Sequence, residues 1–490
     1  MAKVVFVGAG YESLGMEYIS SALKKANHQV SLLFDPILFD EAGFVNIPFL
    51  ARIFSYNSMI KARLKIMQPD LVCLSVTSDN LVWALNMAKL AKKATSAYII
   101  FGGIHPTSAP EEVIKQDEVD FLCVGEGEDA LVELAGSIDQ NNIDYTINNI
   151  WFKTKGAIIR NPVRFLKDNL DNMPIPDKEL YYAKNEFIMK EGYTIITSRG
   201  CPHSCSYCCN SVLKTLYRNK GQYLRRRSVD NVIEELEQAK IRYRLKYIHF
   251  LDEVFVYDKQ WLSEFIQKYI EHIALPFACY LSPQFVDEQV VRLLKQGGCY
   301  KVQMGVQTLD EEKRKKILNR HYTNYKVSLI IKLFRQESIY ITCDNILGLP
   351  GQDEKELTDI ARFYCKNKPD FIETFWLRYY PGTDITRMAQ RLGEIESKGR
   401  VKGITRGGDT YRKELARFQL LLYLIKFMPM SWCDALLRRK MYRYFPASSP
   451  IFLVIFFRLF NRARFDLYTS RTLRRYLLYC FRKLFFIYPF

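Results

Sequence analysis

Three cysteines lie within eight residues of one another in one short segment. Residues 197–211 read TSRGCPHSCSYCCNS, so Cys201, Cys205 and Cys208 follow a CxxxCxxC spacing. Three thiolates on one tight loop can bind three irons of a cubane iron–sulfur cluster, which leaves the fourth iron without a protein ligand. The spacing therefore predicts an iron–sulfur centre with one open coordination position.

Two other uses of these cysteines remain open. A structural zinc site needs four ligands, usually from two CxxC pairs, and no second pair follows nearby. Cys209 and His203 could supply the fourth ligand, but both adjoin cysteines that would already be bound. Buried or redox-active cysteines are the other alternative. The segment follows the first strand of a predicted βα barrel, where active sites lie at the carboxyl ends of the strands, and this position favours the cluster.

At these residues the sequence resembles the radical S-adenosylmethionine superfamily. The resemblance implies that Cys201, Cys205 and Cys208 bind a [4Fe-4S] cluster, whose open iron binds the amino and carboxylate groups of S-adenosylmethionine. It also implies that Tyr207 packs near the adenine. An electron from a donor such as flavodoxin or ferredoxin then cleaves the cofactor to methionine and a 5′-deoxyadenosyl radical.

Later strand ends match further motifs of the same superfamily. The resemblance implies that they contact S-adenosylmethionine, and the matching residues are Asp252, Glu253, Gln307, Gly348, Pro350 and Tyr380. One of Asp252 and Glu253 is expected to contact the amino group of the methionine moiety, and the sequence does not decide between them. Gln307 stands where relatives often carry glutamate. The basic turn RRRS at residues 225–228 could anchor a cofactor carboxylate or phosphate, or could be solvated, with Ser228 capping the next helix.

The amino-terminal part alternates strand and helix patterns. Strands are predicted at residues 3–8, 29–34, 70–76, 98–102 and 121–125. This alternation predicts a doubly wound parallel sheet, in which ligands lie outside the carboxyl ends of the strands. The runs that follow the strands are GAGYESLG, SVTS, GGIHPT and GEGE. The first run is not a dinucleotide fingerprint, because GxGxxG needs a glycine where Ser13 stands.

This set of runs resembles the cobalamin-binding domain that precedes many radical S-adenosylmethionine barrels. The resemblance implies that cobalamin is bound by Ser75, Thr77, Gly102, Gly103, Gly125 and Glu126. Small residues would let the backbone approach a broad, flat corrin ring, although ordinary tight turns would need them too. The cobalt-ligating motif DxHxxG is absent, and His105, which precedes Pro106, is expected to form a loop hydrogen bond instead.

A second strand–helix series predicts a partial (β/α)6 barrel over residues 191–385. Its strands are predicted at residues 193–197, 247–251, 277–280, 301–306, 340–347 and 372–377. The predicted fold is thus α/β, with a doubly wound cobalamin-binding sheet over residues 1–145 and a partial barrel after it. A strand pair and linker occupy residues 146–190, and a helical, basic, aromatic region follows over residues 386–490.

The charge is concentrated at the end of the chain. Of the formal net charge of +17, the last 60 residues carry +10, from 10 Arg and 2 Lys against Asp434 and Asp466, together with 17 aromatic residues. Apolar clusters alternate with arginine at residues 451–460 and 473–486, which suits an amphipathic element on an anionic membrane surface. A helical cap on the barrel is the main alternative, and RNA binding is disfavoured because no RNA module is visible.

These expectations define a function. No apolar run reaches the length of a membrane span and no secretory leader is visible, so the protein is expected in the cytoplasm, peripherally bound to membrane. The resemblance implies a cobalamin-dependent enzyme that methylates an unactivated carbon of a lipid, isoprenoid or tetrapyrrole-like molecule. The alternatives are a radical cyclase or oxidoreductase, an enzyme that modifies RNA or peptide, and a non-catalytic cobalamin or redox sensor.

Overall fold

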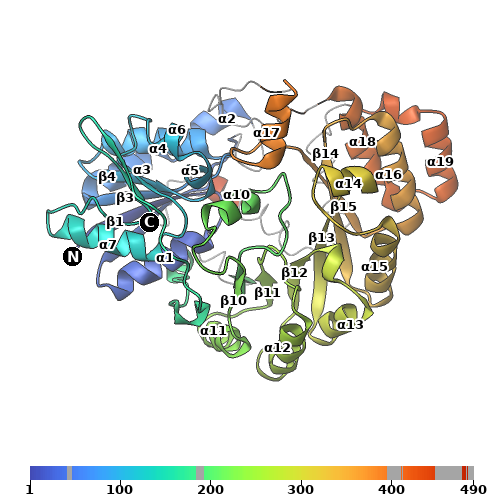
Figure 1. Cartoon of the computed structure of the whole chain (residues 1–490), viewed down its shortest axis with the longest axis horizontal. Helices are drawn as coiled ribbons and strands as arrows, with labels where there is room; N and C mark the ends of the chain where they lie inside the picture. Colours follow the sequence, from blue (N-terminus) through green and yellow to red (C-terminus); the bar gives the residue numbers. More distant parts are fainter. Residues whose placement is uncertain are drawn as a thin grey trace.

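Two α/β units lie side by side in the molecule. The computed structural model describes residues 1–40, 47–183, 192–393, 395, 410, 412–446, 477–481 and 483. Figure 1 shows the amino-terminal unit beside the larger second unit, with the last helices on the far side of the second unit. The first unit is built on a seven-stranded sheet and the second on a six-stranded sheet.

The first sheet has the order β2-β1-β3-β4-β5-β6-β7. Its parallel strands are β1 (Lys3–Ala9), β2 (Gln29–Asp35), β3 (Leu71–Ser75), β4 (Tyr98–Gly102) and β5 (Phe121–Cys123). Helices α1 (Leu14–Lys25) and α7 (Glu128–Asp139) cover one face, and α3 (Asn57–Met67) and α4 (Leu81–Lys92) cover the other (Figure 1). Burial on both faces explains the continuous apolar runs of these strands. The predicted doubly wound sheet is confirmed.

The predicted strand pair after residue 145 is present and extends this sheet. Strands β6 (Ile150–Lys153) and β7 (Ile158–Arg160) are antiparallel to each other, and β6 is antiparallel to β5. The first sheet therefore continues into the segment that the sequence analysis placed before the barrel. Pairing across the sheet edge is a tertiary feature that the local pattern does not contain.

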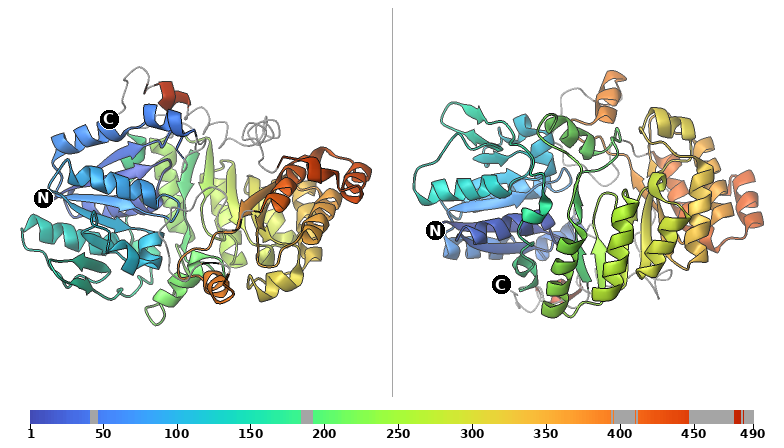
Figure 2. Two further views of the ribbon diagram at one scale, coloured as in Figure 1. Left: turned by 90° about the horizontal axis from the view of Figure 1, so that it is seen from above. Right: turned by 60° about the horizontal axis from the view of Figure 1, so that its bottom comes forward.

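The second sheet is the partial barrel. Its six parallel strands are β8 (Gly192–Ile195), β11 (Tyr247–Phe250), β12 (Phe277–Leu281), β13 (Cys299–Gln307), β14 (Tyr340–Leu347) and β15 (Phe371–Trp376). They lie in the order β15-β14-β13-β12-β11-β8. The outer face carries α11 (Val229–Arg242), α12 (Lys259–His272), α13 (Glu288–Gln296), α15 (Asn324–Gln336) and α16 (Glu354–Asn367), as Figure 2 shows.

The inner face of the barrel stays accessible. On β13, Val302, Met304 and Val306 are buried and face the helices, whereas Gln303 and Gln307 on the opposite side are partly exposed. A closed eight-stranded barrel fills its interior with side chains. In this six-stranded barrel the inward-facing glutamines of β13 are not fully buried.

The carboxyl-terminal region is helical, as predicted. Helix α17 (Asp384–Arg391) is followed by α18 (Lys413–Leu424) and α19 (Met430–Arg438), and both α18 and α19 pack on α16. The predicted apolar segment 451–460 lies outside the described residues, as does most of 473–486. None of the helices that the structure describes is long and apolar enough to cross a membrane.

A buried charge cluster joins the two units through the linker. Lys178 precedes α8 (Glu179–Tyr182), and its ammonium lies 2.6 Å from Glu12 Oε1 and 2.8 Å from Glu17 Oε2. The hydroxyl of Thr194 on β8 also donates to Glu12, at 2.6 Å. The amino-terminal unit, the linker and the first barrel strand therefore meet at one ion-pair site.

Candidate active site between the two sheets

The cysteine loop leaves the first barrel strand and ends on a helix. It begins at β9 (Ser198–Arg199) and runs into α10 (Cys209–Leu216), which lies between the two units in Figure 1. Gly200 has φ +88°, and a Cβ there would lie 2.5 Å from the carbonyl oxygen of Tyr223. Only glycine fits, because both the left-handed backbone and the close approach exclude a side chain. The backbone of the loop is therefore fixed at Gly200.

The thiols of this loop differ in their electrostatic surroundings. Burial raises the pKa of Cys201 to about 12 and also raises the pKa of Cys205. A hydrogen bond with Cys209 lowers the pKa of Cys208 to about 6 despite its burial, and Asn210 Nδ2 donates to Cys208 Sγ at 3.6 Å. Because the thiolate is the form that binds metal, Cys208 is closest to its ligating state, with Cys209 as its hydrogen-bonding neighbour.

This donor set fits an iron–sulfur cluster. Three of the four loop cysteines have the predicted spacing, and among the described residues no group of three His, Cys, Asp or Glu is arranged around one metal ion. Ligands of a single zinc ion must converge to about 2.3 Å from one point. In a cubane cluster each thiolate binds a different iron, so the three sulfurs do not need to converge.

Residues after α14 (Glu311–Lys316) hold the loop from the opposite side. Asn319 Nδ2 donates to the carbonyl of Ser204 at 2.9 Å. The buried guanidinium of Arg320 donates to the hydroxyl of Tyr207 at 3.2 Å and to Ser282 Oγ at 3.0 Å. The sequence analysis missed Arg320, and no local motif could have revealed it, because Tyr207 is 113 residues away along the chain.

The structure shows different surroundings for Asp252 and Glu253, the two acidic residues between which the sequence could not choose a cofactor ligand. The carboxylate of Asp252 is buried and accepts hydrogen bonds from Thr197 N at 3.0 Å, from Thr197 Oγ1 at 2.9 Å and from Ser198 Oγ. It therefore fixes the start of the cysteine loop. The side chain of Glu253 is exposed to solvent; desolvation by the surrounding protein, reinforced by Cys208, raises its pKa, so Glu253 is the carboxyl group that lies near the cysteines.

The later strand-end residues lie at different distances from the cysteines. Tyr380 is close to them, since burial raises its pKa and the thiols of Cys209 and Cys208 add to the rise. Gln307 ends β13 with a φ of +67°. Gly348 and Pro350 are buried in the turn after β14, where Gly348 packs against Thr410. Cofactor contact remains a prediction for Gln307, Gly348 and Pro350.

A cavity of about 270 Å³ lies at the carboxyl ends of β1, β3, β4 and β5. Of the residues predicted to bind cobalamin, it is lined by Ser75, Gly102, Gly103, Gly125 and Glu126. Thr77 is not among the lining residues, and its backbone N–H donates to Asn80 Oδ1 at 2.8 Å. Ile196 and Arg199 of the barrel also line the cavity. The cavity therefore lies between the two units.

One glycine of the predicted cobalamin set is required by the protein's own packing. Gly125 has φ +85°, and a Cβ there would lie 2.0 Å from the hydroxyl of Tyr217, the residue that follows α10. The same hydroxyl accepts a hydrogen bond from Glu126 N at 2.7 Å. The space that the sequence analysis assigned to a corrin ring is at this point occupied by a tyrosine of the barrel unit.

His105 forms the loop hydrogen bond that the sequence analysis expected. It lies on α5 (Ile104–Ser108), and its Nδ1 is 2.8 Å from Ser78 Oγ. Burial lowers its pKa to about 4. His105 is not among the residues that line the cavity.

The arginines of the basic turn at residues 225–228 pack against the protein and are not solvated. Arg225 and Arg227 are buried, and Arg227 Nη1 lies 2.5 Å from Glu235 Oε2. The guanidinium of Arg226 lies 4.2 Å from the ring centre of Trp261. Ser228 caps α11 as predicted, since its hydroxyl accepts from Asn231 N at 3.2 Å. The interpretation as a solvated turn is therefore wrong.

Two families of known proteins match the two units. The B12 binding domain matches residues 4–135, and the radical SAM superfamily matches residues 195–364. The chain combines a B12 binding domain with a radical S-adenosylmethionine domain. Its cofactors are accordingly a [4Fe-4S] cluster, S-adenosylmethionine and cobalamin.

Relatives of this enzyme include methyltransferases. It is 26% identical over 390 residues to an uncharacterized methyltransferase of Pyrococcus horikoshii, covering 78% of this chain and 79% of the relative. It is 25% identical over 385 residues to the hopanoid C-3 methylase of Methylococcus capsulatus, covering 76% and 68%. The solved structure of the cobalamin-dependent S-adenosylmethionine radical enzyme OxsB, with aqua-cobalamin and S-adenosylmethionine bound, aligns with a TM-score of 0.66 at 15% identity. That alignment covers 99% of this chain and 84% of OxsB and supports the fold.

Proposed function

We propose that this enzyme methylates an unactivated carbon of a lipid, isoprenoid or tetrapyrrole-like molecule. The observation that carries the proposal is the shared wall of the two cofactor sites: Arg199 lines the cavity of the B12 binding domain and stands two residues before Cys201. When bound, the cluster with S-adenosylmethionine supplies a hydrogen-abstracting radical, and cobalamin supplies the methyl group. Both cofactors must act on one substrate carbon, which requires that their sites face a common space.

The protein's own residues prepare this space. Cys201, Cys205 and Cys208 hold the cluster, which a flavodoxin or ferredoxin reduces. Arg320 orients Tyr207 within the cysteine loop through the hydrogen bond to its hydroxyl. The exposed carboxyl of Glu253 lies near the cluster cysteines and can accept a hydrogen bond there.

The inner face of the barrel suits a substrate with an apolar body and a polar group. Phe375 on β15 is 48% exposed, and its register with Ile346 places it on the inward side. On the neighbouring strands, Gln303 Nε2 donates to both carboxylate oxygens of Asp344 at 3.0 Å. A phenyl ring on the same face as a carboxylate–amide pair fits hydroxylated isoprenoid lipids, and the hopanoid methylase among the relatives supports this class.

Anaerobic reconstitution with iron, sulfide and cobalamin tests the proposal. The enzyme would be given a reductant, S-adenosylmethionine with a deuterated methyl group, and hydroxylated hopanoids or magnesium-protoporphyrin monomethyl ester in parallel. We expect one deuterated methyl group in the product for each 5′-deoxyadenosine formed, and none with the Cys201→Ala variant. A product changed in mass without the label, as cyclisation or oxidation gives, would refute methyl transfer.

We infer further that the enzyme docks on anionic membrane through its last described helices. The docking surface consists of α19 and the turn η4 (Met441–Tyr444). Trp432, which is 68% exposed, and the exposed Met441 and Tyr444 supply apolar contact, and Arg438, Arg439 and Lys440 are exposed beside them. Exposed rings flanked by cations match the boundary between acyl chains and anionic headgroups. The charge on this surface favours a lipid bilayer as its partner.

Fluorescence quenching by brominated lipid tests this surface. Trp432 is the exposed one of five tryptophans, so vesicles of phosphatidylglycerol with brominated acyl chains should quench the protein's emission. The Trp432→Phe variant should lose that quenching, whereas Tyr325→Ala, which removes an aromatic ring 78% exposed on α15, should not. Binding without quenching, or equal retention on RNA, would contradict docking through α19.

A further inference from the structure

An ion-pair network connects the cysteine loop to the cavity of the B12 binding domain. Strand β9 pairs antiparallel with β10 (Arg225–Arg226), and Arg199 lies opposite Arg225 in the register. Both side chains form ion pairs just after β5, with Glu126 in the loop for both and with Glu128, the first residue of α7, for Arg199. The two arginines belong to the barrel unit and the two glutamates to the first unit. The network therefore crosses the interface between the two cofactor domains.

The contacts are close and largely shielded from water. Arg199 Nη2 lies 2.5 Å from Glu128 Oε1, and Arg199 Nη1 lies 3.4 Å from Glu126 Oε2. Arg225 forms an ion pair with Glu126 and donates to the carbonyl of Lys167 at 2.9 Å. The side chain of Arg225 is 2% exposed. Charge-assisted hydrogen bonds of a planar guanidinium are directional, so the four side chains define one relative placement of the two loops.

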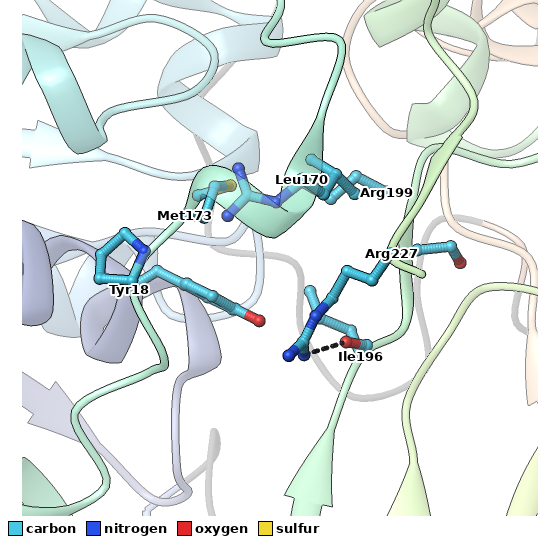
Figure 3. A pocket seen from close by; sticks show the side chains of 8 residues that line it. Tyr18, Leu170, Met173, Ile196, Arg199 and Arg227 are labelled. Carbon is cyan, nitrogen blue, oxygen red and sulfur yellow. Dashed lines mark hydrogen bonds between the residues drawn. The ribbon is translucent and has the colours of Figure 1, made fainter. Parts of the chain in front are cut away.

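Arg199 also contacts the first helix of the B12 binding domain. Its guanidinium lies 5.0 Å from the ring centre of Tyr18 on α1. Figure 3 shows Tyr18 reaching from α1 toward Arg227 of the barrel, with Arg199 alongside. The pocket drawn in Figure 3 is a small cavity of about 10 Å³, which is the size of one water molecule. Three of its lining residues also line the larger cavity of about 270 Å³, namely Tyr18, Ile196 and Arg199. Arg199 thus contacts two separate parts of the first unit.

Glu126 is already engaged by the protein at both its polar groups. Its carboxylate pairs with two arginines, and its backbone N–H donates to the hydroxyl of Tyr217. The resemblance implied that Glu126 binds cobalamin. These contacts point instead to a role in docking the barrel, because each bond that Glu126 forms in the described structure leads to the barrel unit.

We propose that Arg199, Arg225, Glu126 and Glu128 are positioning residues that set the separation and orientation of the two cofactor sites. The proposal rests on the assignment of both cofactors, but it concerns their geometry and does not depend on which substrate is methylated. Arg199 is two residues from a cluster ligand and lines the cobalamin cavity, so a shift of its side chain moves both sites relative to each other. The network acts on the relative placement of the two sites.

The test measures the magnetic interaction between the two cofactors without any substrate. In the reconstituted enzyme, the reduced cluster and cob(II)alamin are both paramagnetic, and their coupling in electron paramagnetic resonance depends on their separation. We expect Arg225→Gln, which changes a side chain that lines neither cavity, to keep iron, sulfide and cobalamin contents at the level of the unmodified enzyme and to lose the single well-defined coupling. The conservative variant Arg225→Lys, which keeps the charge, should restore it in part.

A matched control removes an ion pair outside the interface. Arg160 forms a bidentate pair with Glu111 within the first unit, at 2.7 and 2.8 Å, and both side chains are exposed. Arg160→Gln should leave the coupling unchanged. An unchanged coupling in Arg225→Gln would overturn the proposal, and so would loss of either cofactor from that variant. If the unmodified enzyme shows the coupling but methylates no lipid, the proposed function fails and the positioning role stands.

Discussion

Replacing Lys178 with methionine should destabilise the enzyme more than replacing any exposed lysine. Lys178 is 2% exposed and lies within 2.8 Å of carboxylate oxygens of both Glu12 and Glu17. Methionine keeps most of the volume but leaves two carboxyl groups in a buried site without a cation. Removing one partner of a buried ion pair costs roughly 3–5 kcal/mol. The loss of stability should therefore arise where the two units and the linker meet.

The pH dependence of this loss can be worked out from the carboxyl groups. In the unmodified enzyme burial raises the pKa of Glu12, but Lys178 outweighs burial and holds it below the usual value. That contribution to stability is present above the unfolded pKa and is lost as the pH falls through the folded pKa. Burial already raises the pKa of Glu17 in the unmodified enzyme. Without Lys178, burial should raise the pKa values of both Glu12 and Glu17. The stability of Lys178→Met should therefore fall as the pH rises above about 4.5.

Urea unfolding of the apoprotein at pH 5 and pH 7.5, followed by circular dichroism, measures the effect. With a slope of about 3 kcal/mol per molar urea, the expected loss lowers the midpoint by about 1–2 M at pH 7.5, and by less at pH 5. The control is Lys24→Met, because Lys24 forms an ion pair with Asp177 at 2.6 Å but is 43% exposed. An exposed pair contributes at most about 1 kcal/mol. Equal midpoint shifts for the two variants, or a Lys178→Met shift that does not grow with pH, would refute the reasoning.

Three further predictions follow from the site. Alanine at any of the three cluster cysteines should abolish the visible absorption of the reconstituted cluster, whereas Cys209→Ala should retain it, and a cluster that survives loss of a ligand would refute the assignment. Gly125→Ala should lower the melting temperature, because its Cβ would collide with a tyrosine hydroxyl at 2.0 Å, whereas Gly136→Ala, in open space on α7, should stabilise by about 0.5–1 kcal/mol. Burial raises the pKa of Asp344 to about 7, so stability should fall by at most about 1.4 kcal/mol per pH unit between pH 4 and 7. Asp344→Asn should flatten that slope in melting temperatures measured across this range, and an unchanged slope would exclude Asp344 as its source.

The strands could be predicted because burial on both faces leaves a strong local signal. Residues 4–7 of β1 are all buried, and β14 matches its predicted bounds at residues 340–347. The edge pairing of β6 and β7 with β5 could not be predicted, since the hydrogen-bonding partner of a strand is not written in its own residues. The sequence pattern therefore predicted most of the strands. It did not predict where the first unit ends along the chain and the second begins.

The site could be predicted only where its residues lie close together in the chain. The CxxxCxxC spacing is local, so the cysteine loop was found directly. Asp252 and Glu253 are adjacent at a strand end, and neighbouring side chains there point in different directions, so the sequence could not choose between them. Tyr217 contacts Glu126 across 91 residues, and no spacing rule extends over such a distance.

The contacts of Gly125 and Glu126 indicate that the GEGE run packs against the barrel unit, whereas the sequence analysis assigned it to cobalamin binding. The missing Cβ of Gly125 makes room for Tyr217, and Glu126 binds Tyr217 through its backbone and two arginines through its carboxylate. These partners lie on β9, β10 and the end of α10, the segment that also carries the cluster cysteines. A B12 binding domain separated from the barrel would therefore keep its sheet but leave its Glu126 and Glu128 carboxylates without their cations. The motif of one cofactor domain and the motif of the other form one packing unit, because each supplies the contacts that the other requires.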